Sequence, residues 1–292
     1  MNKLIIFCIL LFFLVLKSRW EIPDYFSYLY RYESITSYRN IFATDPLFSI
    51  YILVFKNFNF SYDNFRIITT FIAFLSTFFF SIQSKDNLSN YIRLLSSLFI
   101  ILVYLHGALR QGLACLFILH GLFFLRNIPT NLFLIIASGL HLSFFIPLFL
   151  NIFKQIYFLI FLPIIIILFF FLYGDKVNNL FIAYSSYVYD LPTRGYFYRA
   201  VFFILLLLPY YQLSKEKKLD LLYLSIIIFF FSIISSLFNF ITFADRILTI
   251  AITLLLSFIS IYCIKFNMRL KLFYIFTVFI TLIFWINFSK LI

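Results

Sequence analysis

Continuous apolar runs, several of them close to twenty residues long, fill this sequence from end to end. Hydrophobic residues make up 64% of the 292 positions and the mean hydropathy is +1.05, so a soluble domain could not hide its apolar side chains from water. Runs of this length suit helices that cross a bilayer, whereas a membrane β-barrel would show shorter segments with alternating polar and apolar residues. The sequence therefore predicts an all-α, polytopic helical membrane protein.

The chain is expected to form about 9 to 11 membrane segments, including a broken hairpin near His141. No long linker rich in Pro, Gly or Ser interrupts it, so residues 1–292 are predicted to be a single integral membrane domain. Residues 4–16 resemble a signal peptide but lack a small-residue cleavage pattern, and we expect them to remain as a first helix. The other expected segments are residues 65–82, 91–105, 111–125, 132–153, 156–173, 197–208, 219–238, 246–264 and 272–288.

The longest polar stretch, residues 17–64, is rich in tyrosine and carries an apolar patch at residues 46–55. This patch is too short to span a bilayer, so we expect a loop whose helix lies on the membrane surface or re-enters the membrane. A second loop is expected at residues 174–199.

A net charge of +12 would suggest a nucleic-acid partner for a soluble protein, but here the cations lie mostly at the ends of apolar runs. They therefore indicate topology, and no nucleic-acid partner is expected. Arg126, Lys154 and the lysine-rich stretches at 215–218 and 265–271 can all be cytoplasmic only if residues 132–153 leave and return as a hairpin. The N-terminus is then cytoplasmic, and the candidate site residues fall on the outer side.

Arg110 opens an apolar helix in which Gly112 and Ala114 allow close approach of a ligand or a neighbouring backbone. A guanidinium at this place suits an anion such as phosphate, with His106 one turn earlier as a second polar group; an interfacial arginine that snorkels to lipid headgroups is the alternative. His141, at the expected hairpin tip, could donate to a phosphate oxygen or accept a proton, or could be a hydrogen-bonded packing residue.

The expected loop at residues 174–199 interleaves Arg194 and Arg199 with Tyr196 and Tyr198. Arginines suit phosphate and aromatic faces suit sugar rings, which fits a lipid-linked, diphosphate-bearing glycan. Solvated charges with an aromatic belt at the membrane boundary are the alternative.

Three carboxylates near the outer side, Asp24, Asp45 and Asp245, are candidates for a general base. Asp45 precedes Pro46 and could instead be a helix N-cap, and Asp245 could simply neutralise Arg246. The sequence has no P-loop, HExxH, GxSxG or DxD motif, and its three cysteines show no metal-ligand spacing. No metal site, nucleotide or other cofactor is therefore expected.

An ordered series of short motifs extends over nearly the whole chain: Asp24-Tyr25, Asp45-Pro46-Leu47-Phe48, Arg110-Gln111-Gly112-Leu113-Ala114, His141-Leu142-Ser143 and Arg246. This series resembles the EpsG-type bacterial polysaccharide polymerases, which are functional relatives of the Wzy O-antigen polymerases. The chain departs from the pattern by carrying Asp rather than Glu before Pro46 and by lacking a tyrosine soon after Arg246.

The resemblance implies a membrane glycosyltransferase that joins undecaprenyl-diphosphate-linked oligosaccharide repeat units at the outer face of the bacterial cytoplasmic membrane. Such a reaction builds O-antigen, capsule or exopolysaccharide without a metal or nucleotide, in contact with membrane lipids and with a chain-length regulator as a possible partner. Two alternatives stay open: a flippase for lipid-linked sugars, and a glycosyltransferase that uses a polyprenyl-phosphate sugar. The implied catalytic residues are Arg110, His141, Asp24 and Asp45, and the implied substrate-binding residues are His106, Arg194, Tyr196, Arg199, Asp245 and Arg246.

Overall fold

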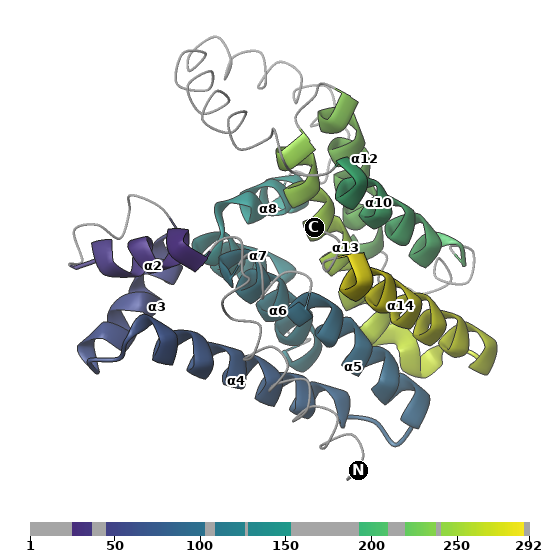
Figure 1. Cartoon of the computed structure of the whole chain (residues 1–292). Helices are drawn as coiled ribbons and strands as arrows, with labels where there is room; N and C mark the ends of the chain where they lie inside the picture. The colour runs from purple at the N-terminus through teal and green to yellow at the C-terminus, as the bar shows by residue number, and fades with distance from the viewer. Residues whose placement is uncertain are drawn as a thin grey trace.

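The computed structural model describes residues 25–36, 45–102, 109–125, 128–152, 193–209, 220–237 and 241–288. All regular elements in these ranges are helical, which confirms the all-α prediction for this part of the chain (Figure 1). The helices are α2 (Tyr25–Ser34), α3 (Pro46–Asn57), α4 (Tyr62–Ser81), α5 (Asn87–Ile100), α6 (Leu109–Phe124), α7 (Thr130–Leu140), α8 (Phe145–Ile152), α10 (Thr193–Leu207), α12 (Asp220–Leu237), α13 (Ile241–Tyr262) and α14 (Met268–Phe288), with short 3-10 turns η4 (Leu142–Phe144) and η5 (Cys263–Lys265).

Two of the described helical segments are long and apolar enough to cross a membrane, Tyr62–Ser81 with 20 residues and Ala244–Lys265 with 22. At 1.5 Å per residue they extend about 30 and 33 Å, which matches the hydrocarbon thickness of a bilayer. Shorter apolar helical segments of 10 to 17 residues, among them Pro46–Asn57 and Leu109–Phe124, also occur in the described ranges. The count of about 9 to 11 membrane segments stays a prediction, and the expected segments at residues 4–16 and 156–173 lie outside the described residues.

Helix α13 is the centre of the bundle and contacts α5, α6, α10 and α12. Its apolar segment is 83% buried. Thr249, Thr253 and Ser257 are buried along it and each donates to the backbone carbonyl four residues earlier, so these hydroxyls need no external partner. Small side chains of this kind let neighbouring helices approach closely.

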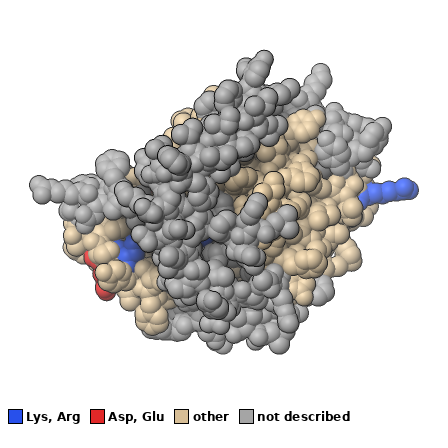
Figure 2. Space-filling model, turned by 90° about the horizontal axis from the view of Figure 1, so that it is seen from above, with Lys and Arg blue, Asp and Glu red and all other residues tan. Residues whose placement is uncertain are grey.

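The outward faces of the bundle are apolar. Helix α14 exposes Leu272, Phe276, Phe279 and Ile283, which recur at helical spacing and form one stripe. Helices α4, α5, α6 and α14 run from left to right in Figure 1; seen from above in Figure 2, the described surface is mostly uncharged, with charged side chains mainly towards its left and right margins. An apolar perimeter with charged ends is the surface expected of a protein embedded in lipid.

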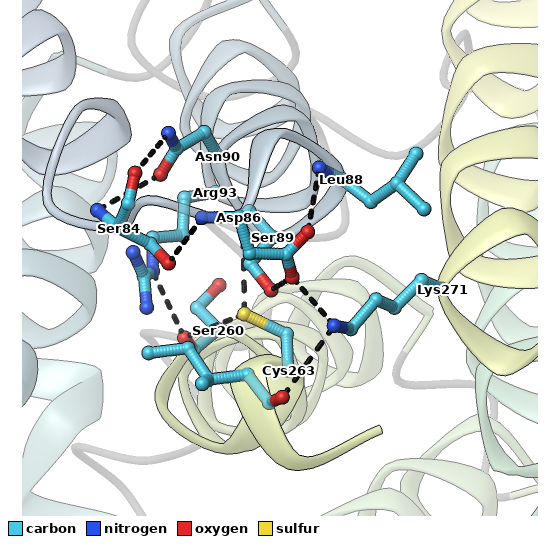
Figure 3. A network of polar contacts seen from close by, with 10 residues as sticks. Ser84, Asp86, Leu88, Ser89, Asn90, Arg93, Ser260, Cys263 and Lys271 are labelled. Atoms are coloured by element: carbon cyan, nitrogen blue, oxygen red, sulfur yellow. Dashed lines mark hydrogen bonds and ion pairs between the residues drawn. The ribbon is translucent and has the colours of Figure 1, made fainter. Parts of the chain in front are cut away.

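A polar network fastens the end of the bundle where α5 and α14 begin (Figure 3). The Asp86 carboxylate pairs with Lys271 Nζ at 2.5 Å and also accepts from Ser89 Oγ. These hydrogen bonds, led by that from Lys271, hold the pKa of Asp86 at about 2. Fully buried Arg93 donates from Nε to the Ser260 carbonyl at 3.2 Å, so the network joins α5 to both α13 and α14.

The broken hairpin expected at residues 132–153 has the predicted shape. Helix α7 ends at Leu140. The next residue, His141, is extended with φ −154° and ψ 117°, and η4 then leads into α8. Asn151 near the end of α8 donates to Asn131 at the start of α7, so the chain returns along its own path.

Two expected loops contain helix. Residues 17–64 were predicted to hold one helix, but they hold both α2 and α3, because Tyr25, Tyr28 and Tyr32 lie on one buried face of α2 at spacings of three and four. The expected loop at 174–199 is wrong for its last residues, since α10 begins at Thr193 and includes Arg194 and Arg199. A charged first turn is tolerated where a helix meets the membrane boundary.

Candidate functional site

Asp45 stands at the N-cap position of α3 and is followed by Pro46, as the capping alternative requires. Its backbone carbonyl accepts from the Ser49 amide at 3.0 Å, but its side chain makes no capping hydrogen bond. The Asp45 carboxylate instead turns into the protein, where it is almost completely buried. Local helix formation therefore does not account for this side chain.

Three donors from separate elements converge on the Asp45 carboxylate. Arg110 Nη1, from the first turn of α6, pairs with Oδ2, and Arg31 Nη2, from α2, lies 3.5 Å from the same oxygen. The backbone N–H of Leu142, at the hairpin tip, donates to Oδ1 at 2.9 Å. Asp45 thereby joins α2, α3, α6 and the hairpin tip, and both of its oxygens are occupied.

Aromatic rings support the two arginines. The Arg110 Cζ atom lies 5.5 Å from the centroid of the Tyr28 ring, and the Arg31 Cζ atom lies 5.8 Å from that of Phe48. Cations over ring faces are stabilised electrostatically and sterically restrained. The guanidinium groups are therefore positioned before any ligand binds.

His141 lies beside this cluster with 8% of its surface exposed. Its Nδ1 faces Ser143 Oγ and is 3.4 Å from the Ser143 backbone nitrogen. Because a backbone N–H can only donate, Nδ1 is the accepting nitrogen, and the proton of the neutral ring is assigned to Nε2. This tautomer makes His141 Nε2–H a hydrogen-bond donor; donation to a phosphate oxygen stays a prediction.

Among the described residues, the charged groups around His141 are mostly cationic. Arg31, Arg110 and Arg246 all act electrostatically on His141, and Asp45 is the carboxylate from the described part of the chain that does so. Burial first, and then the neighbouring Arg110, lower the pKa of Arg31 to about 10, so it is still protonated at neutral pH. Partly buried guanidinium groups gathered in this way favour an anionic ligand.

A second ion pair lies beside the first cluster. Arg199 Nη2 of α10 is 2.5 Å from Asp245 Oδ1 of α13, so Asp245 forms an ion pair with a residue of another helix. The Gln111 amide donates to the Arg246 carbonyl at 3.2 Å, and Gln111 directly follows Arg110. The start of α6 therefore connects the two polar clusters.

Tyr196, expected to bind substrate, has its hydroxyl 3.2 Å from Ser232 Oγ on α12, and Ser232 in turn donates to the Ala244 carbonyl at 2.6 Å. Asp24 and His106 lie outside the described residues, as does the side chain of Arg194 in the first turn of α10. Among the described residues, no group of three His, Cys, Asp or Glu side chains could hold a metal ion.

The sequence reading missed Arg31 and Tyr28. Both lie in the segment Tyr25–Ser34, on the face that also carries buried Tyr25 and Tyr32. The spacing of these residues was visible in the sequence and is helical. It was missed because tyrosines and a charge do not form a continuous apolar run.

The fold and the site together define a helical membrane protein with an arginine-rich polar site near one end of an apolar bundle. The model of the EpsG family matches residues 2–291, and the chain belongs to the EpsG family, which confirms the resemblance in the motifs. The family associates the chain with the membrane and with polysaccharide biosynthesis. No curated protein and no solved structure matches it.

Proposed function

We propose that the protein joins undecaprenyl-diphosphate-linked oligosaccharide repeat units into a polymer at the outer face of the bacterial cytoplasmic membrane. The observation that supports this most is the convergence of Arg31 and Arg110 on one buried carboxylate beside His141. A diphosphate is the part of such a substrate that these arginines would bind.

In the proposed reaction, a hydroxyl oxygen of the incoming unit forms a bond to the anomeric carbon of the growing chain. The bond from that carbon to the lipid diphosphate breaks, its electron pair stays on the diphosphate oxygen, and the hydroxyl proton passes to a base. Arg31, Arg110 and the Nε2–H of His141 would stabilise the charge that develops on the leaving diphosphate. Asp24 and Asp45 are the candidate bases from the sequence.

The second cluster would hold the other lipid-linked unit. Arg199 and Arg246 supply cations, and Tyr196 supplies an aromatic face suited to a sugar ring. The connection through Gln111 keeps this cluster close to Arg110, as a transfer between two bound units requires.

The distribution of cations along the chain supports the proposed outer location. Arg246 lies in the second turn of α13, whereas Lys265 and Lys271 lie beyond its other end. Lysine-rich ends prefer the cytoplasm, so the end with Asp45 and Arg110 would face outwards. Lipid-linked repeat units polymerised there need no nucleotide.

Purified protein in liposomes, supplied with lipid-diphosphate repeat units from cells that lack it and with no nucleotide sugar, should form a ladder of polymers and release undecaprenyl diphosphate. Arg110→Ala should reduce the rate about 100-fold, because one charge-stabilising donor is lost. Arg269→Ala, an exposed arginine at the opposite end, should retain the wild-type rate.

Other outcomes separate the alternatives. Substrate that crosses the bilayer without bond formation would indicate a flippase. Addition of one sugar from a polyprenyl-phosphate donor would indicate the other glycosyltransferase class. Either result, with no ladder from the wild type, would contradict the polymerase proposal.

A further inference from the structure

The donors around Asp45 are those that proteins use for phosphate. One small anionic group, the Asp45 carboxylate, contacts the guanidinium groups of Arg31 and Arg110 and accepts from the backbone N–H of Leu142. Arginine forks and backbone amides bind carboxylates and phosphates through the same hydrogen-bond geometry. The carboxylate therefore occupies a place that a phosphate group could also occupy.

The exposure of the three side chains indicates how an anion would reach this place. The Asp45 side chain is 3% exposed, whereas those of Arg31 and Arg110 are 16% and 25% exposed. The carboxylate is thus the most deeply buried of the three groups, and part of each arginine side chain remains accessible from outside. An incoming anion can contact the arginines before Asp45 moves.

The Asp45 carboxylate also has no second task that would keep it there. It does not cap α3, whose first turn is already formed by Pro46 and by the Ser49 amide bonded to the Asp45 carbonyl. Without a counterion, however, Arg31 and Arg110 would repel each other while partly buried, which is costly. The empty site therefore needs an internal anion, and a site filled by phosphate does not.

We propose that Asp45 is an internal stand-in for the substrate's phosphate and is displaced from Arg31 and Arg110 when a lipid-linked diphosphate binds. This inference rests on the proposed function for the identity of the ligand. Asp45 is then a positioning residue: it keeps the two arginines and the hairpin tip in place in the empty site. After transfer it competes with the departing undecaprenyl diphosphate and speeds its release.

The test uses inorganic pyrophosphate, without lipid or sugar, and the purified full-length chain in detergent. Removing the internal competitor by Asp45→Asn should strengthen pyrophosphate binding at least tenfold, and Asp45→Glu should leave it near the wild-type value. Asp63→Asn is the matched control, because this carboxylate accepts from the Tyr25 hydroxyl at 3.0 Å outside the cluster. The pyrophosphate affinity of Asp63→Asn should equal that of the wild type.

Thermal unfolding distinguishes this role from others. Asp45→Asn should have a lower Tm than the wild type in the absence of pyrophosphate, and the difference should disappear at saturating pyrophosphate. If the difference in Tm between Asp45→Asn and the wild type stays the same at all pyrophosphate concentrations, Asp45 only supports the fold. Unchanged affinity together with lost polymerisation would mean that Asp45 is the base, and either result overturns the proposal.

Two further outcomes keep the test decisive. If Asp45→Asn folds only when pyrophosphate is present, and not in chloride of equal ionic strength, the proposal is supported; if pyrophosphate does not rescue it while Asp45→Glu folds, the proposal fails. If Asp45→Asn binds pyrophosphate more tightly but the wild type makes no polymer, the stand-in role is upheld and the proposed function is refuted. If the wild type makes polymer but Asp45→Asn binds pyrophosphate no more tightly, the proposed function is upheld and the stand-in role is refuted.

Discussion

Arg31 and Arg110 approach one carboxylate oxygen from different helices, and the contact of Arg31 with Asp45 is the longer of the two. Arg110 also stacks on Tyr28, whereas Arg31 stacks on Phe48. Either side chain can therefore be removed while the other keeps Asp45 paired. A variant that lacks one arginine can therefore lose ligand binding while the remaining arginine still holds Asp45 in place.

Arg31→Ala should lower polymer formation about tenfold to 100-fold, because a hydrogen bond to a charged group contributes about 1.5 to 3 kcal/mol. Arg31→Lys should recover only part of the loss, since an ammonium lacks the planar fork. Polymer ladders and the amount of protein in the membrane are the measurements. A wild-type ladder from Arg31→Ala would exclude this side chain from the site.

Individual residues of the candidate site differ in how well they could be recognised from the sequence. Arg110 and His141 were recognisable because a cation and an imidazole are expensive inside apolar sequence. Asp45 was recognisable as a carboxylate but looked equally like an N-cap. Only its position relative to Arg31 and Leu142, which are 14 and 97 positions away in the chain, shows what its side chain contacts.

At the scale of elements, the site depends on how closely α3 packs against α7. A Cβ atom added at Gly139 would lie 2.6 Å from Leu47 Cγ, and Leu47 is two residues after Asp45. No larger residue fits at position 139 without moving this leucine. The absence of a side chain there holds the start of α3 against the hairpin tip.

Gly139→Ala should therefore lower polymer formation several-fold, since overpacking costs about 1 to 3 kcal/mol and shifts Asp45 relative to Leu142. Adding Leu47→Ala should restore it by making room for the new methyl group. Gly121→Ala is the matched control: its Cβ would be as crowded, 2.8 Å from the Phe133 ring, but away from Asp45. It should reduce thermal stability and leave the activity per folded molecule unchanged.

If Gly139→Ala and Gly121→Ala lower the activity per folded molecule equally, packing of α3 on α7 has no special role. Failure of Leu47→Ala to rescue Gly139→Ala would lead to the same conclusion. Activity should be normalised to protein extracted from the membrane, because both substitutions strain the bundle.

At the scale of the whole molecule, the two polar networks lie at opposite ends of α13. The network of Asp86, Arg93 and Lys271 joins α5 to α13 and α14 at one end, and the cluster around Asp45 lies near Arg246 at the other. With an apolar perimeter between them, the chain is expected to sit across the bilayer with the Asp45 cluster outside.

Single cysteines at the two ends of α4 test this orientation. Phe58→Cys lies before this helix and Lys85→Cys after it, both at exposed positions. In intact cells a membrane-impermeant maleimide should label position 58 and should label position 85 only after the membrane is opened. The opposite pattern would place the site on the cytoplasmic side. The unsubstituted chain measures the background.

The sequence alone determined the helical membrane class, the broken hairpin and the positions of most helices, because apolar runs must be buried in lipid or in the bundle wherever they occur. Residues 65–82, for example, were expected to span and lie within or next to α4. Helix α2 and the start of α10 were missed because polar and aromatic residues form helices through tertiary packing.

Only the tertiary structure decided which partner each charge takes. Asp45 pairs with Arg31 and Arg110, and Asp245 pairs with Arg199, although each has other cations nearby in the sequence. The burial of an apolar segment depends on its own composition and can be predicted from the sequence. An ion pair depends on the distance between two side chains in space, which the sequence does not give. The sequence therefore identified Asp45, Arg110 and His141 as candidates but missed Arg31. The packing of α2, α3, α6 and the hairpin decided that Arg31, Arg110 and the Leu142 amide meet at the Asp45 carboxylate.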